Sequence, residues 1–113
     1  MRHLISLFEL SDEELSDLLS EARRLKKAHA RGKTKPLLAG RALGLIFEKP
    51  SLRTRVSFQA AVAHLGGTSI FMTGSEAGFN GRESLPDCAR TMSQFVDAVV
   101  LRTFSQETVD TFA

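Results

Sequence analysis

The sequence contains no tryptophan and no tyrosine, and it has one cysteine and three histidines among 113 residues. The single cysteine, Cys88, excludes an internal disulfide. The scattered histidines (His3, His29 and His64) give with it no metal-ligand spacing, so we expect no metal site. Nucleic-acid binding is disfavoured, because the formal net charge is only +2 and the rings on which bases stack best are absent.

Long apolar runs are missing as well. No stretch approaches the roughly 20 apolar residues of a membrane-spanning helix, and the opening MRHLISLFELSDEEL reaches acidic residues too early for a signal peptide. With 42% hydrophobic and 25% charged residues, the composition indicates one globular domain at most, in the cytoplasm and away from membranes. The densest basic stretch, residues 23–35, falls at the end of an expected helix, where cations complement the helix dipole and stay solvated.

The apolar residues that are present first recur at helical spacing. Leucines follow Ser11 in this pattern, and Ser11 with Glu14 forms a capping box, so a helix is predicted from there to about Gly32. The unbroken apolar run ALGLIF, residues 42–47, predicts a strand that is buried on both faces of a parallel sheet.

A second helix is predicted to begin near Ser51 and to end at Gly66 and Gly67. Its apolar residues lack the alternation of a strand and indicate a helix with much of its surface covered. Residues 68–72 then predict a second strand, and residues 73–83 a glycine-bearing loop.

Ser84 caps the next predicted helix, whose apolar stripe contains Cys88. The stripe consists of Leu85, Cys88, Ala89, Met92, Phe95 and Val96. Within it Cys88 is interpreted as a small buried side chain rather than a nucleophile, since nothing nearby in sequence would lower its pKa. Residues 98–101 predict a third buried strand, and residues 105–113 begin another helix. This alternation predicts an α/β fold with a parallel, doubly wound sheet, helices on both faces, and ligands at the carboxyl ends of the strands.

The turn after the first strand, EKPSLRTRVSF at residues 48–58, gathers hydroxyl and guanidinium groups where the second helix begins. The first backbone N–H groups of a helix are free and its N-terminus is positive, so such a turn can hold phosphate. Two cations there oppose the dipole unless an anion compensates them. The groups available are the rigid turn at Pro50, a Ser51 hydroxyl that caps the helix or donates, the N–H groups from Leu52 to Thr54, the Thr54 hydroxyl and the Arg53 fork.

Arg102 follows the third strand as Ser51 follows the first, so both are expected at one edge of the sheet, where Arg53 and Arg102 could grip one small ligand. Of two roles for Lys49, contact with the ligand or balancing the charge of Glu48, the second is expected. The glycine-rich patterns of nucleotide P-loops and dinucleotide folds are absent from the sequence. An ordinary helix N-terminus and a surface arginine remain the alternative interpretation.

Residues 47–58, FEKPSLRTRVSF, resemble the carbamoyl-phosphate motif F-x-x-P-S-T-R-T-R-x-S-F of the carbamoyltransferases. HLGG, GRESLPDCAR and DAVVLR follow in the family's order, so the resemblance spans essentially the whole chain. Glu48, Lys49 and the opening RHLISLFELSDEEL are similar to the ornithine enzymes rather than the aspartate enzymes.

The resemblance implies transfer of a carbamoyl group from carbamoyl phosphate to the side-chain amine of ornithine, giving citrulline and phosphate, without a metal or other cofactor. Carried over by motif, Ser51, Leu52, Arg53 and Thr54 bind the phosphate. Arg102 reaches the phosphate and the carbamoyl oxygen, and Arg53 and Arg102 are the catalytic candidates. Other implied acceptors are aspartate or a modified ornithine, and a non-catalytic small-anion-binding module is the alternative from a different class.

Two positions depart from the family pattern. Leu52 replaces the usual threonine, which fits a position that contributes chiefly its backbone N–H. The loop SEAGFNGRES lacks the glutamine that ornithine enzymes commonly place before the Glu83-Ser84 pair and that reaches a neighbouring subunit's site; Asn80 or Arg82 are the candidates to replace it.

The resemblance also implies that residues 1–113 form an incomplete carbamoyl-phosphate-binding domain, with the second, ornithine-binding domain absent. The chain alone is then expected to be inactive, and the full-length enzyme to be a homotrimer with its sites between subunits.

Overall fold

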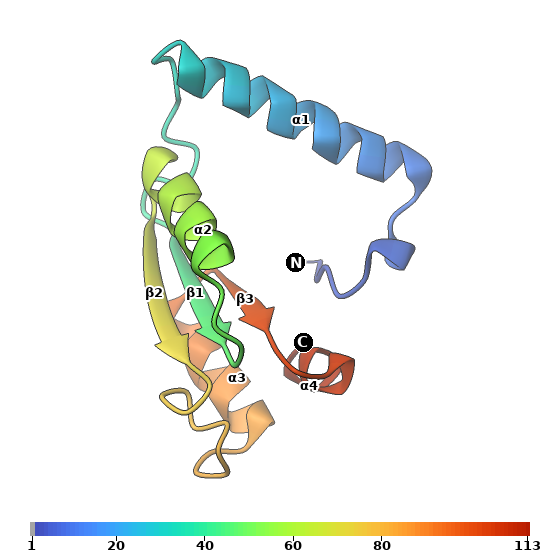
Figure 1. Cartoon of the computed structure of the whole chain (residues 1–113), viewed down its shortest axis with the longest axis vertical. Coiled ribbons are helices and arrows are strands. Elements are labelled where there is room, and N and C mark those ends of the chain that lie inside the picture. Colours follow the sequence, from blue (N-terminus) through green and yellow to red (C-terminus); the bar gives the residue numbers. More distant parts are fainter. Residues whose placement is uncertain (1) are drawn as a thin grey trace. The chain divides into compact units, whose positions relative to one another are not determined.

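The computed structural model describes residues 2–113, which divide into two compact units, one ending at Lys35 and the other running from Pro36 to Ala113. The element order is shown in Figure 1. No helix of the described residues is both long and apolar enough to cross a membrane.

The first unit contains the short 3-10 helix η1 (Leu7–Glu9) and the long helix α1 (Asp12–Ala30). The predicted capping box is confirmed, since Ser11 Oγ accepts a hydrogen bond from the Glu14 N–H and the Glu14 carboxylate accepts one from the Ser11 N–H. Gly32 follows the helix with φ of 67°, a left-handed conformation that suits glycine at a helix end. No residue of α1 is buried, so its leucines stay at the surface.

The second unit is built on a three-stranded sheet of β1 (Ala42–Phe47), β2 (Thr68–Thr73) and β3 (Ala98–Arg102). The order is β2-β1-β3 and both pairings are parallel. The first strand was predicted to the residue, and the other two extend one residue further than expected. Because β1 is the middle strand, it is covered on both sides, as its unbroken apolarity predicts.

Three helices accompany the sheet: α2 (Leu52–His64), α3 (Leu85–Phe95) and the short α4 (Gln106–Phe112). In Figure 1, α2 lies in front of the sheet and α3 behind it, so the sheet has a helix on each face. The predicted α/β architecture is therefore confirmed.

The core forms around β1, where Leu45 and Ile46 are fully buried. Ile46 packs with Cys88 and Met92 of α3. Gly44 lies beneath the same helix, because a Cβ added there would come within 2.7 Å of the Met92 Cε. Alternation along the strand then turns Leu45 toward the opposite face, the side of α2.

Three packing predictions are wrong. Residues 98–101 were predicted as a buried strand, but β3 has no buried residue, because it lies at an edge of the sheet. The surface of α2 is largely exposed and only Val62 is buried, because within its own unit the helix packs on one face of the sheet. Phe95, predicted in the core stripe of α3, is 73% exposed. It is the last residue of the helix, and the core contact passes instead to Val96, which packs against the buried cluster.

Candidate functional site

A tight turn joins the carboxyl end of β1 to α2. The Glu48 N–H donates to the carbonyl of Arg102 at the end of β3 (2.8 Å), and the Gly74 N–H, just beyond β2, donates to the carbonyl of Phe47 (3.1 Å). The carboxyl ends of all three strands therefore meet at one edge, as expected for a parallel sheet, and α2 begins at that edge.

The N-terminus of α2 differs from those of the other described helices. The serines that precede η1, α1, α3 and α4 each accept a hydrogen bond from a backbone N–H of their own helix. Ser51 occupies the same position before α2 but makes no such bond, and its hydroxyl donates instead to Thr54 Oγ1 (2.9 Å). The first-turn N–H groups thus lack the side-chain cap that the other helices have, and the start of α2 offers donors and positive potential to an anion.

The two arginines that the sequence singled out are both exposed. Arg53 lies in the first turn of α2, and Arg102 ends β3, where it pairs in register with Phe47 of β1. Neither takes part in an ion pair within residues 2–113. Their predicted placement at one sheet edge is confirmed, whereas a joint grip on one ligand stays a prediction.

A cavity of about 560 Å³ opens beside the turn, between the start of α2, the end of β2 and the loop that follows β2. A second cavity of about 300 Å³ contains Arg102, and Phe104 lines both. Arg53 and Thr54 line neither of these two cavities. The larger one contains Ser51, Leu52, Arg55, Asn80 and the rings of Phe47, Phe71, Phe79 and Phe104.

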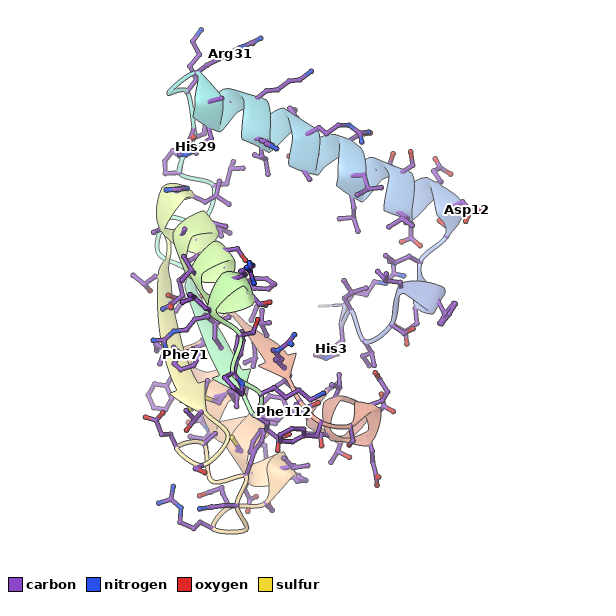
Figure 2. All side chains as sticks on the ribbon, in the orientation of Figure 1. His3, Asp12, His29, Arg31, Phe71 and Phe112 are labelled. Atoms are coloured by element: carbon purple, nitrogen blue, oxygen red, sulfur yellow. The ribbon has the colours of Figure 1, made fainter. Side chains whose placement is uncertain are left out.

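Arg55 is the residue of this site that the sequence reasoning missed. Its guanidinium carbon lies 3.5 Å from the centroid of the Phe71 ring, and its Nε donates to Gln59 Oε1 (3.1 Å). Phe71 lies on β2, as Figure 2 shows. The available signal was the second arginine of the R-T-R segment, but its aromatic partner comes from a strand sixteen residues later in the chain and no local pattern reveals it.

The expectation for Lys49 is wrong. Its Nζ lies over the ring of Phe104 at 5.3 Å from the centroid, and residues 2–113 contain no ion pair between Lys49 and Glu48. An exposed phenylalanine beside the turn attracts the ammonium through its ring face.

The loop after β2 is ordered by its own hydrogen bonds. Thr73 and Glu76 bond reciprocally, backbone N–H to side-chain oxygen in both directions, and these bonds, helped by the charge of Arg55, lower the pKa of Glu76. Of the two candidates to replace the family's glutamine, Asn80 lines the larger cavity, while Arg82 donates to the carbonyl of Ser75 (2.6 Å). Whether either residue serves that role stays a prediction.

Cys88 is buried in the core, and burial raises the pKa of its thiol. Its interpretation as a packing residue is confirmed, since a raised pKa disfavours the nucleophilic thiolate. Within residues 2–113, no three histidine, cysteine, aspartate or glutamate side chains gather where they could hold a metal ion.

The family model for the "Aspartate/ornithine carbamoyltransferase, carbamoyl-P binding domain" matches residues 2–113. This chain belongs to the aspartate/ornithine carbamoyltransferase family. The resemblance carried by the motif around Arg53 is thereby confirmed at the level of the family.

Relatives and solved structures of the family match along nearly the whole chain. An ornithine carbamoyltransferase of Desulfotalea psychrophila is 46% identical over 98% of the chain, which spans 37% of that relative. The ornithine carbamoyltransferase structure from Pyrococcus furiosus has a TM-score of 0.94 at 37% identity and covers 98% of this chain and 36% of its own. The aspartate transcarbamoylase catalytic subunit of M. jannaschii has a TM-score of 0.87 at 36% identity, with 99% and 37% covered. The chain thus spans little more than a third of the length of the family members that it matches.

Proposed function

We propose that this chain binds carbamoyl phosphate at the N-terminus of α2 and serves as the carbamoyl-phosphate-binding part of an ornithine carbamoyltransferase. The observation that carries the proposal is the uncapped start of α2, which presents the segment Ser51 to Thr54 at the edge where all three strands end. A carbamoyl-phosphate-binding family model that covers residues 2–113 supports the same ligand.

Each proposed contact has a physical basis. The N–H groups of Leu52, Arg53 and Thr54 donate to phosphate oxygens, and the Arg53 guanidinium adds a planar fork to the same group. Leu52 needs no hydroxyl for this role, and its side chain is 79% exposed beside the larger cavity. Ser51, whose hydroxyl is not used as a cap, turns toward the phosphate when the ligand is present.

The proposed reaction is attack of the ornithine side-chain amine on the carbamoyl carbon. Negative charge grows first on the carbonyl oxygen and then on the departing phosphate, and preorganised donors stabilise charge where it develops. We assign the carbonyl oxygen to Arg102, which also reaches the phosphate, and the leaving phosphate to Arg53 and the first turn of α2. The products are citrulline and phosphate, a step suited to arginine biosynthesis in the cytoplasm.

The acceptor-binding part is proposed to lie outside these 113 residues, and the complete enzyme is proposed to be a homotrimer. Aspartate is the second candidate acceptor, because the aspartate transcarbamoylase subunit of M. jannaschii matches the chain at 36% identity, against 37% for the ornithine enzyme of P. furiosus. Ornithine is preferred because the relatives matched at 46% and 42% identity are both ornithine carbamoyltransferases.

Calorimetric titration of carbamoyl phosphate into the chain tests the binding step, with inorganic phosphate titrated for comparison. Loss of a hydrogen-bonded charge is worth about 1.5–3 kcal/mol, so Arg53→Ala should weaken binding about 10- to 100-fold. Arg90→Ala, which removes an exposed arginine from the surface of α3, should leave affinity unchanged. Equal affinities of the wild type and Arg53→Ala would refute the assignment of the phosphate to this turn.

Whether this chain completes an ornithine or an aspartate enzyme is tested with two chimeras, in which it replaces the matching third of the D. psychrophila ornithine enzyme or of the M. jannaschii aspartate enzyme. We expect citrulline formation by the first chimera, abolished by Arg53→Ala. Carbamoyl-aspartate formation by the second chimera alone would reverse the choice of acceptor.

A further inference from the structure

The two arginines of the R-T-R segment are held differently. Arg53 takes part in no ion pair within residues 2–113, whereas Arg55, two residues later, is fixed by two contacts. Its guanidinium lies 3.5 Å from the Phe71 ring centroid and its Nε donates to Gln59 Oε1 at 3.1 Å. The planar group is thus oriented both by a ring face and by a directed hydrogen bond.

These contacts explain how a second cation is tolerated near the N-terminus of a helix, where the dipole disfavours it. The Phe71 ring and the Gln59 oxygen are both electron-rich partners for the guanidinium. Glu76 supplies a carboxylate in the same neighbourhood, since its pKa is lowered by its bonds with Thr73 and further by the charge of Arg55. The positive charge of Arg55 is therefore compensated by groups of the protein itself. The charge of Arg53 remains available to an anionic ligand.

The partners of Arg55 connect it to two strands of the sheet, β2 and β1. Gln59, its hydrogen-bond partner, donates from Nε2 to Ser69 Oγ of β2 (3.1 Å). Phe71 packs edge-on against Phe47 of β1, with ring centroids 5.5 Å apart. The start of α2 is in this way tied to the two strands that it crosses, and Arg55 is the connecting side chain.

We propose that Arg55 is a positioning residue: stacked on Phe71 and bonded to Gln59, it holds the first turn of α2 in the orientation in which the turn binds carbamoyl phosphate. The inference rests on the proposed function for the identity of the ligand. It assigns Arg55 a role through the turn, without contact to the substrate. Lysine cannot replace it, because an ammonium lacks the plane that stacks on Phe71 and the fork that reaches Gln59 at the same time.

The test combines carbamoyl-phosphate titration with amide order parameters from ¹⁵N relaxation of the ligand-free chain. The variants are Arg55→Lys, Phe71→Leu and the double variant, with Arg90→Lys and Phe112→Leu as controls. Phe112 pairs edge-on with Phe79 (6.1 Å between centroids), so its replacement reports the loss of an aromatic pair that includes neither Arg55 nor Phe71.

Each single variant should weaken carbamoyl-phosphate binding about 2- to 5-fold, the range of one cation–π contact. The double variant should bind no more weakly than the weaker single variant, because both substitutions remove the same contact. Order parameters of the first-turn amides should fall from about 0.85 toward about 0.6. Both control variants should keep wild-type affinity and wild-type order parameters in that turn.

Three outcomes overturn the proposal. Wild-type affinity in Arg55→Lys would mean that charge alone suffices. Loss of affinity in Arg55→Lys with unchanged affinity and order parameters in Phe71→Leu would mean that Arg55 contacts the ligand directly. The third outcome is that first-turn order parameters stay unchanged and that Phe112→Leu lowers affinity as much as the Arg55 and Phe71 variants do for the same fall in melting temperature. Arg55 would then have only a general packing role. If the wild type binds no carbamoyl phosphate, the proposed function fails for this chain, and the order parameters still decide whether Arg55 fixes the turn.

Discussion

Replacing Ser51 by aspartate should stabilise the chain and impair its ligand binding at the same time. Aspartate is a good N-cap, and α2 lacks the side-chain cap that the other helices have. The new cap is worth about 1 kcal/mol and the carboxylate at the positive helix end about 0.3–1 kcal/mol. Loss of the Ser51–Thr54 hydroxyl bond, about 0.5 kcal/mol, offsets part of this gain. The free energy of unfolding should therefore rise by about 1 kcal/mol.

The same carboxylate stands where the phosphate is proposed to bind. Two like charges about 5 Å apart repel by about 1–3 kcal/mol for effective dielectric constants between those of water and a protein surface. Carbamoyl-phosphate affinity should fall about 5-fold or more. Thermal unfolding should show a melting temperature about 4–8 °C higher, as expected for a domain of this size, and calorimetry should show the weaker binding.

Ser84→Asp in α3 is the matched control, because it exchanges one working cap for another at the start of a different helix. Both its stability and its affinity should stay close to wild type. A destabilised Ser51→Asp variant would mean that the Ser51 position cannot cap α2. Unchanged affinity in that variant would refute the placement of the phosphate at this helix end.

Three further outcomes are expected. Ile46→Ala, which truncates a fully buried side chain in the cluster with Cys88 and Met92, should lower the free energy of unfolding by about 2–5 kcal/mol in urea denaturation, and a loss below about 1 kcal/mol would contradict the packing described. The Ala42 N–H and the Arg41 guanidinium lower the pKa of Asp97, so the stability that this carboxylate adds is present at neutral pH and is lost as the pH falls below its ordinary value of 3.8. The urea midpoint should accordingly fall less between about pH 6 and about pH 3 in Asp97→Asn than in the wild type. The same pH dependence in both proteins would contradict a stabilising role of the Asp97 carboxylate. Finally, the 113-residue chain alone should form citrulline no faster than the uncatalysed reaction, a prediction that any catalysed rate in a colorimetric citrulline assay would contradict.

Local signals predicted most of the helices and strands of both units. The apolar run of β1 indicated a strand buried on both faces, and the serines at 11, 51 and 84 marked the starts of three helices within a residue. These features depend on neighbours in sequence, which is why periodicity and capping rules reach them. The family motif added the ligand, which no local propensity specifies.

Contacts between distant segments were beyond such rules. The partner of Arg55 is a ring on β2 and that of Lys49 a ring after β3, and both pairs depend on how strands align in space. The exposure of α2 was missed for the same reason. Apolar residues in a helix predict burial, but they do not show which other segment would cover them. The sequence also left open whether the Ser51 hydroxyl caps α2 or donates a hydrogen bond. In the structure it donates to Thr54 Oγ1.

The strand order of the sheet has a consequence for the route by which it folds. β1 is synthesised first but lies in the middle of the sheet. Ala42 pairs with Thr68 of β2, and Leu43 pairs with Ala98 of β3, so β1 is hydrogen-bonded on both edges only after both later strands have been synthesised. Such parallel, long-range pairings form slowly, because the entropy of a large loop is lost before the strand contacts contribute any stabilising free energy. During synthesis the most apolar strand of the chain therefore remains a half-paired edge until β3 has emerged, and this interval is when the nascent chain is most prone to aggregate or to need a chaperone.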